Sequence, residues 1–240
     1  MKQLFFYTFL AIILFSSCRE DDAPYINPTF QWPVGTSDYA PYTVGSTFAY
    51  EIKNTNPAQT DSFTLTVEKD TVISGLMYYK LVSSKPAIQP TYFVNYNNGN
   101  LTEITYNLDY LNLGAIIVPK VLETTLKENL AVNDTWVESM VVQYPLSPTQ
   151  FVDITVAFSH TMLEKNFTKR VFDKDFSSTI AVKQIITSIA PSWFIWPLGV
   201  PTTSQFDNFY AKGAGLVQRD VYSEITLKST QKLKSYNIVK

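Results

Sequence analysis

Residues 63–68 read Phe63-Thr64-Leu65-Thr66-Val67-Glu68, with apolar and polar side chains in strict alternation. Successive side chains of a β-strand point to opposite faces of the sheet, so this stretch predicts a strand with one buried and one solvated face. The same alternation returns in Ile154, Val156 and Phe158. Antiparallel sheets commonly keep one face in the core and the other in water. The sequence therefore predicts a mainly β, antiparallel fold.

The same pattern predicts further strands along most of the chain. They lie at residues 47–53, 77–83, 92–96, 101–106, 136–144, 180–189, 205–211, 215–222 and 225–233. Asn98-Gly99 separates two of these strands, and Asn-Gly is typical of the two-residue turn of a β-hairpin. We expect a strongly curved antiparallel sheet or two packed sheets.

One segment, at about residues 119–131, also fits a helix. Pro119 suits a first helical turn, and Leu122, Leu126 and Leu130 recur every four residues. The alternative architecture is therefore a half-barrel wrapped on one helix at about 119–131.

Two short stretches of the chain resemble each other. Residues 44–48 and 132–136 both begin with Val and end with Thr followed by an aromatic residue. In each, a turn-prone pair precedes the predicted start of a strand. We interpret residues 42–240 as a single β-rich domain, in which the repeat leaves open two similar lobes at about 42–118 and 119–240.

The first 17 residues have the features of a secretory signal. Lys2 is followed by an apolar run at residues 4–15, which is too short to cross a bilayer. Ser16 and Ser17 precede Cys18, the single cysteine, and this arrangement resembles a bacterial lipobox. The resemblance implies that residues 1–17 are a lipoprotein signal peptide and that Cys18 carries the lipid that anchors the protein to a membrane. The alternative is an ordinary cleaved signal with an incidental cysteine.

An acidic run directly follows the cysteine. Glu20, Asp21 and Asp22 resemble the export signal that places Bacteroidota lipoproteins on the cell surface. Four prolines then occur up to residue 41, so residues 18–41 are interpreted as the lipidated cysteine and an extended, proline-rich tether. The predicted location is the outer membrane, exposed at the cell surface. A solvated acidic linker on a protein facing the periplasm is the alternative.

Three further motifs resemble a class of uncharacterised, β-rich Bacteroidota lipoproteins. They are a Val-Gly-x-Thr-aromatic opening at residues 44–48, a Gly-x-x-Tyr-Tyr-Lys-Leu strand at residues 75–81 and a late glycine-containing strand at residues 210–217. The resemblance implies a β fold and an envelope location, and it implies no activity.

The composition excludes several kinds of chemistry. With 19 basic and 21 acidic residues, the chain lacks the basic excess of a nucleic-acid-binding protein. The single histidine, His160, follows Phe158 at a spacing of two residues, so it shares the apolar face of its predicted strand and is interpreted as a packing residue. We therefore predict no catalytic residue, no metal site and no cofactor. A hydrolase based on carboxylates is the least favoured alternative, and its nearest pair, Asp173 and Asp175, fits a solvated loop.

Residues 191–197 contain the most suggestive aromatic cluster. Trp193, Phe194 and Trp196 lie between two prolines, and such side chains stack on sugar rings or anchor protein interfaces. Burial as a plug over the open end of the sheet is the other interpretation. The hypothesis from sequence is a non-catalytic, surface-anchored lipoprotein that serves as a binding or accessory module for a glycan, lipid or envelope protein. The alternative is a purely structural envelope protein without a ligand.

Overall fold

Antiparallel strands account for most of the computed structural model, which describes residues 38–108, 118–147, 149–194, 203–223 and 225–239. These residues all belong to one unit, Gly35–Lys240. The strands are β1 (Thr47–Thr55), β2 (Ala58–Ile73), β3 (Leu76–Ser83), β4 (Tyr92–Asn97), β5 (Asn100–Leu108), β6 (Val118–Lys127), β7 (Thr135–Ser147), β8 (Gln150–Val171), β9 (Lys174–Ile189), β10 (Thr203–Ala211), β11 (Gly215–Ser223) and β12 (Thr226–Asn237).

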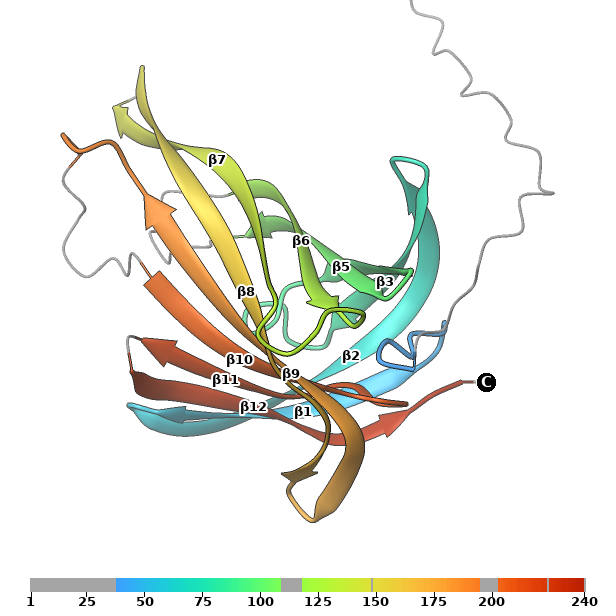
Figure 1. The fold of residues 1–240 in the computed structure, drawn as a ribbon. Coiled ribbons are helices and arrows are strands. Elements are labelled where there is room, and N and C mark those ends of the chain that lie inside the picture. The colour runs from blue at the N-terminus through green and yellow to red at the C-terminus, as the bar shows by residue number, and fades with distance from the viewer. Residues whose placement is uncertain (1–37, 109–117, 148, 195–202, 224, 240) are drawn as a thin grey trace, which may run out of the picture. The chain divides into compact units, whose positions relative to one another are not determined.

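One sheet contains all twelve strands, in the order β6-β5-β4-β3-β2-β1-β12-β11-β10-β9-β8-β7. Strands β1 to β6 therefore form one meander and strands β7 to β12 a second, and the two join through the β1–β12 ladder. The sheet curves so strongly that its edge strands, β6 and β7, approach each other (Figure 1). The prediction of a mainly β, antiparallel, strongly curved sheet is confirmed, and the Asn98-Gly99 turn joins β4 to β5 with positive φ at both residues.

The predicted helix at 119–131 is wrong, because β6 occupies most of this segment. Val121, Glu123 and Thr125 are buried on its inner side, whereas Leu122 is 53% exposed. In a regular strand, residues four apart share one face, as they do on a helix. A register shift in the β5–β6 ladder breaks this rule here and leaves Leu122 exposed but Leu126 fully buried. Pairing with β5 along most of the segment supplies the backbone hydrogen bonds, and this long-range pairing decides the structure.

The first of the two similar stretches, residues 44–48, leads into β1. Gly45 has a φ of 89° and donates its N–H to the carbonyl of Val67 at 2.8 Å. The N–H of Val67 donates in return to the carbonyl of Ser46 at 2.9 Å. This pair of bonds fixes the start of β1 against β2.

The second stretch, residues 132–136, leads into β7 with the same bonds. Asn133 has a φ of 72° and donates to the carbonyl of Met162 at 2.8 Å, and Met162 donates to the carbonyl of Asp134 at 2.9 Å. The first strand of each meander therefore begins in the same way. The division of the chain into lobes at residues 118 and 119 stays a prediction.

Two apolar clusters line the inner face of the sheet. One is centred on large side chains such as Phe48, Tyr50 and Tyr210, and the other on Phe158, Ile154 and their neighbours in β7 to β9. Between the clusters lies a row of polar side chains that we call the polar belt: Glu103, Glu123, His160, Gln184, Asn208 and Arg219.

The position of the belt follows from strand parity. Gln184, for example, lies two residues from Val182 in the first cluster and two residues from Ile186 in the second. Side chains two residues apart share a face of the sheet, so the belt faces the interior.

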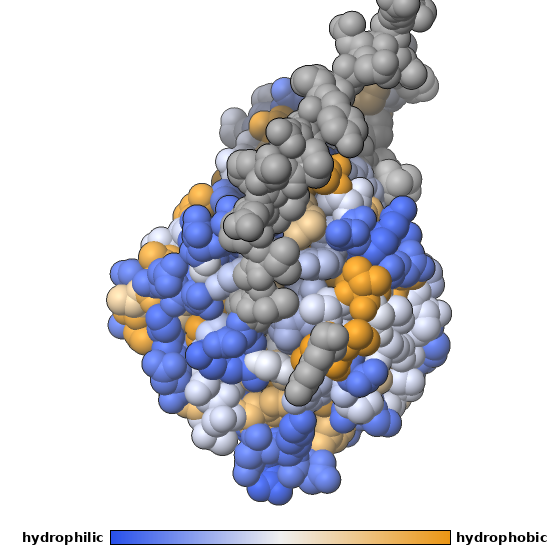
Figure 2. Space-filling model, turned by 90° about the vertical axis from the view of Figure 1, so that its right-hand side faces the viewer, coloured by the Kyte–Doolittle hydropathy of each residue, from blue (hydrophilic) through white to orange (hydrophobic). Residues whose placement is uncertain are grey.

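On the face shown in Figure 2, hydrophobic side chains form separate patches between hydrophilic ones. In the described part of the chain, no helical segment has the length and hydropathy needed to span a bilayer.

Candidate functional site

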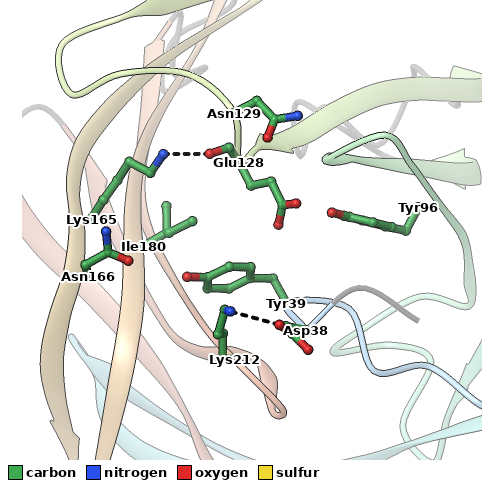
Figure 3. Close-up of a pocket in the computed structure, with 9 residues that line it drawn as sticks. All are labelled: Asp38, Tyr39, Tyr96, Glu128, Asn129, Lys165, Asn166, Ile180 and Lys212. Atoms are coloured by element: carbon green, nitrogen blue, oxygen red, sulfur yellow. Dashed lines mark hydrogen bonds and ion pairs between the residues drawn. The ribbon is translucent and has the colours of Figure 1, made fainter. Parts of the chain in front are cut away.

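A polar pocket of about 400 Å³ lies where the ends of several strands meet (Figure 3). Its residues come from the segment before β1, from β4, β8 and β9, and from the β6–β7 and β10–β11 connections. They are Asp38, Tyr39, Tyr96, Glu128, Asn129, Lys165, Asn166, Ile180 and Lys212. Because both meanders contribute, the pocket depends on the curvature of the whole sheet.

Protein oxygens hold both lysines of this pocket. Lys165 donates from Nζ to the backbone carbonyls of Glu128 at 2.7 Å and Leu130 at 3.0 Å. Lys212 forms an ion pair with Asp38, with 2.8 Å between Nζ and Oδ2. These contacts fix the β6–β7 and β10–β11 connections at the rim.

Two tyrosines and a carboxylate face the space between these lysines. The ring of Tyr39 lies beside the Glu128 side chain, and the hydroxyl of Tyr96 points toward that side chain (Figure 3). Tyr39 is buried, and burial raises the pKa of its hydroxyl, so this group stays protonated and can donate a hydrogen bond at neutral pH. The pocket thus offers aromatic surface, hydroxyls, amides and a carboxylate to a polar ligand.

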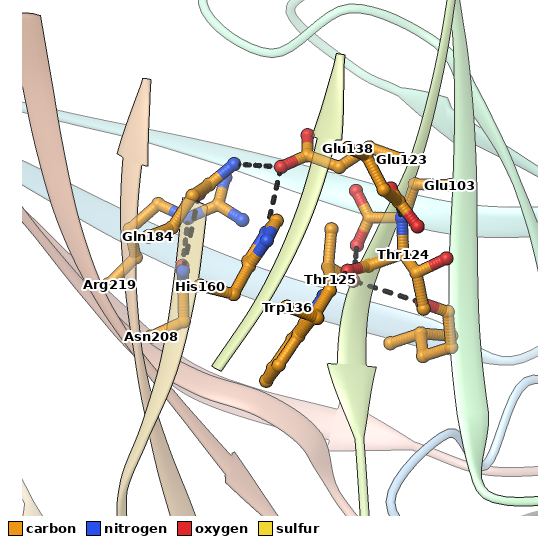
Figure 4. A network of polar contacts seen from close by, with 11 residues as sticks. Glu103, Glu123, Thr124, Thr125, Trp136, Glu138, His160, Gln184, Asn208 and Arg219 are labelled. Carbon is orange, nitrogen blue, oxygen red and sulfur yellow. Dashed lines mark hydrogen bonds and ion pairs between the residues drawn. The ribbon is translucent and has the colours of Figure 1, made fainter. Parts of the chain in front are cut away.

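The polar belt is a second unusual arrangement (Figure 4). Glu103 and Glu123 are direct cross-strand partners on β5 and β6, a placement that puts two acidic groups side by side. Burial raises the pKa of the Glu103 carboxyl, and the nearby guanidinium of Arg219 opposes that rise. The side chain of Thr125 also donates to Glu103 Oε1 at 3.1 Å.

Glu123 is held by groups from the far side of the interior. His160 Nε2 lies 3.0 Å from its Oε1, and the amide of Gln184 donates to the same oxygen. The chain of contacts continues as Asn208 donates to Gln184 at 3.4 Å and Arg219 Nε donates to Asn208 at 2.6 Å. Side chains thereby connect β6 to β8, β9, β10 and β11.

His160 is enclosed on every side. It is fully buried, and its ring stacks on Trp136 with a centroid distance of 4.7 Å and an interplanar angle of 3°. Its Nδ1 has no hydrogen-bond partner in the described part of the chain. The interpretation of His160 as an inward packing residue agrees with this position, but the contact with Glu123 adds a polar role.

Side chains also bridge the two edge strands directly. Trp136 Nε1 donates to the carbonyl of Thr124 at 2.8 Å, and the N–H of Thr124 donates to Glu138 Oε2 at 2.7 Å. Two residues of β7 therefore satisfy both backbone groups of one residue of β6.

Trp193 and Phe194, two of the aromatic residues predicted from sequence, lie apart from the pocket and the belt. Trp193 is 64% exposed, and Phe194 is half-buried with its ring against Tyr144 at 5.4 Å. Trp196 lies outside the described residues, as do Cys18 and the acidic residues Glu20, Asp21 and Asp22. The structure does not test a binding role for any of them.

The carboxylates weighed from sequence, Asp173 and Asp175, are exposed at the β8–β9 turn, and Asp175 pairs with Arg170 at 3.8 Å. The inward-facing carboxylates are Glu103 and Glu123, which sequence reasoning missed. Glu103 lies two residues from Leu101 in a predicted strand, so the sequence could have indicated that both side chains face inward. Glu123 lies in the segment that was interpreted as a helix, so its inward direction was not predicted. The described residues contain no group of three or more potential metal ligands.

No protein-family model matches the sequence, and neither does any curated protein. Two solved bacterial structures are similar. One is described as a putative lipoprotein from Parabacteroides distasonis, with 12% identity and a TM-score of 0.50 over 81% of this chain and 96% of the other. The second is described as a putative exported protein with a YmcC-like fold from Bacteroides fragilis, with 11% identity and a TM-score of 0.46 over 82% and 97%. At 12% identity, the first similarity shows a shared fold.

Proposed function

We propose that this protein is a non-catalytic lipoprotein, anchored through Cys18 to the outer membrane and exposed at the cell surface, that binds a glycan in the pocket of Figure 3. The lipobox resemblance at Cys18 and the acidic run at Glu20, Asp21 and Asp22 support the anchor and the location. The description of the Parabacteroides protein as a lipoprotein agrees with them.

The polar pocket is the observation that carries the binding function. Tyr39 and Tyr96 supply aromatic surface, and Asn166 supplies an amide group that both donates and accepts hydrogen bonds. Asn129, whose Nδ2 donates to the carbonyl of Asn98 at 3.0 Å, supplies an amide oxygen that accepts. Sugars present the matching combination of apolar ring faces and hydroxyls. Ile180 is the single aliphatic residue among those that line the pocket, so an acyl chain would find few apolar contacts there. The pocket chemistry therefore favours a glycan over a lipid.

Titration of the full-length protein, purified in detergent, against a panel of oligosaccharides tests this proposal. We expect saturable binding that Tyr96→Ala weakens at least tenfold, since stacking contributes about 1 kcal/mol or more beyond the lost hydroxyl contact. Tyr106→Ala is the matched control, because Tyr106 lies on β5 outside the pocket, in contact with Phe93. Absence of binding to every glycan would favour the purely structural alternative.

The aromatic residues 193–196 stay a predicted second contact surface. Measuring Trp193→Ala in the same titration shows whether the glycan binds in the pocket or at these aromatic residues. A loss of affinity in Trp193→Ala with unchanged affinity in Tyr96→Ala would move the binding site from the pocket to the aromatic residues.

The anchor has its own test. In cells, Cys18→Ala is expected to abolish incorporation of labelled palmitate and to release the protein from the membrane fraction. Replacing Glu20, Asp21 and Asp22 with alanine is expected to preserve labelling but to protect the protein from protease added outside the cells. Labelling of the Cys18→Ala variant would contradict the lipid anchor.

A further inference from the structure

We infer that the glycan bound in this pocket carries a free amine and that Glu128 binds its ammonium group. This inference rests on the proposed function and adds the chemical class of the sugar.

The charged side chains of the pocket differ in whether protein groups already bind them. Asp38 and Lys212 neutralise each other, and two backbone carbonyls hold Lys165. The carboxylate of Glu128 forms no hydrogen bond or ion pair with any described residue, and it points into the space beside Tyr39 and Tyr96 (Figure 3). One negative group is therefore available to a ligand, whereas both positive groups are already engaged.

This arrangement discriminates between kinds of sugar. An ammonium group beside Glu128 would form a charge-assisted hydrogen bond and would also meet the aromatic rings, which attract cations. An acidic sugar would have to displace Asp38 from Lys212 or the carbonyls from Lys165. An N-acetylated amine has no charge for the carboxylate to bind. The pocket thus favours an amino sugar over acidic and acetylated sugars.

A close backbone approach places Glu128 at this position. Its N–H donates to the carbonyl of Gly99 at 2.8 Å, and Gly99 has a φ of 81°. A Cβ at Gly99 would lie 2.9 Å from Cγ of Glu128 and closer still to the amide of Asn129. The backbone of the β4–β5 turn therefore packs closely against the base of the Glu128 side chain and fixes where that side chain begins.

The test compares a chitosan trimer with its N-acetylated form and with a neutral glucose trimer, by calorimetric titration of the full-length protein at pH 6, where the amines of chitosan are mostly protonated. We expect the chitosan trimer to bind at least tenfold more tightly than the other two, and its affinity to fall as salt rises. Glu128→Gln is expected to reduce chitosan affinity about ten- to hundredfold and to leave binding of the neutral trimer unchanged. Glu68→Gln is the matched control, because Glu68 is exposed on β2 and paired with Lys80 outside the pocket.

The outcomes separate the inference from the function on which it rests. Equal binding of the three trimers, unchanged by Glu128→Gln, would overturn the amine inference and leave the glycan site standing. Tighter binding of a glucuronate oligomer than of chitosan would overturn it as well. Failure of every saccharide to bind would overturn both, and circular dichroism of each variant verifies that the β structure is intact.

Discussion

The two places where a meander begins have the same backbone and different side chains. In the β1–β2 pair, Phe48 lies opposite Leu65 in an apolar contact. In the β7–β8 pair, the equivalent register position places Trp136 opposite His160. Both pairs adjoin the same type of turn, so the difference does not arise from local backbone requirements.

The position of each strand in the sheet explains the difference. β1 has a hydrogen-bonded neighbour on both sides, β2 and β12, so its backbone groups are paired by ladders. β7 pairs with β8, and among the described residues the side chains of Trp136 and Glu138, rather than a backbone ladder, join it to β6. Between β6 and β7, hydrogen bonds from polar side chains take the place of a backbone ladder. At β1, ladders on both sides already join the strands, so an apolar pair is sufficient there. The polar belt therefore maintains the closure of the curved sheet.

The largest effect is expected from Glu123→Ala, which removes the acceptor that joins β6 to His160 and Gln184. Breaking a buried, hydrogen-bonded pair on one side leaves polar groups without partners and costs about 3–5 kcal/mol. Urea denaturation measures the change in the free energy of unfolding. Glu68→Gln, at an exposed ion pair, is expected to change it by less than about 1 kcal/mol. A similarly small effect of Glu123→Ala would mean that the contact between the edge strands β6 and β7 does not depend on the polar belt.

A smaller loss is expected when His160, opposite Trp136 in the β7–β8 pair, is replaced by leucine, the residue that lies opposite Phe48 in the β1–β2 pair. His160→Leu removes the contact with Glu123 and is expected to cost about 2–3 kcal/mol, because the buried carboxylate loses a hydrogen-bond partner from across the interior.

The double variant Glu123→Leu/His160→Leu sharpens this result. Replacing both members of a buried polar pair with apolar groups of similar size is much less costly than removing one. With Glu123→Leu and His160→Leu measured singly, the double variant is therefore expected to be more stable than the sum of these two single changes predicts, by about 1–3 kcal/mol. Additive costs would show that the two side chains act independently.

The fold was largely predictable from sequence because strand parity is a local signal. The alternation in residues 63–68 and the Asn98-Gly99 turn each predict their own element without knowledge of the partner strand. β6 was not predictable in this way, since its leucine spacing fits two structures and its pairing with β5 decides between them.

The candidate site was less accessible to sequence reasoning. The pocket joins Tyr39, Tyr96 and Glu128 from segments separated by tens of residues, and only the curvature of the sheet brings them together. Parity predicted that His160 points inward, but no pattern in one strand reveals that Glu123 on another strand accepts its hydrogen bond. Strand faces could therefore be predicted, whereas contacts between strands distant in sequence could not.

Another test concerns the turns that precede β1 and β7. Gly45 and Asn133 both have positive φ, a conformation that costs most L-residues about 1–2 kcal/mol. Gly45→Ala is expected to destabilise by about that amount, and its Cβ would also approach Val239 at 3.2 Å. Asn133→Gly is expected to change the stability by only a few tenths of a kcal/mol, because asparagine tolerates this region and glycine adds chain entropy to the unfolded state. Thermal unfolding of both variants measures the contrast, and equal losses would show that the turns are not equivalent.

The smallest effect is expected from the belt residue that the first meander contributes on β5. The pKa of Glu103 is raised in the folded protein, chiefly by burial, so the folded state binds its proton more tightly than the unfolded state does. Stability therefore falls as pH rises above the unfolded value of roughly 4.3, because ionisation then favours the unfolded chain.

Glu103→Gln removes this ionisation while keeping a side chain of similar shape that can still accept the hydrogen bond from Thr125. The variant is expected to gain stability relative to the wild-type protein as pH rises from 4 toward 8, with the smallest difference at the acidic end. Urea midpoints measured across this range test the trend, and a difference that stays constant with pH would contradict it. Such a constant difference would mean that Glu103 ionises in the folded protein as readily as in the unfolded chain.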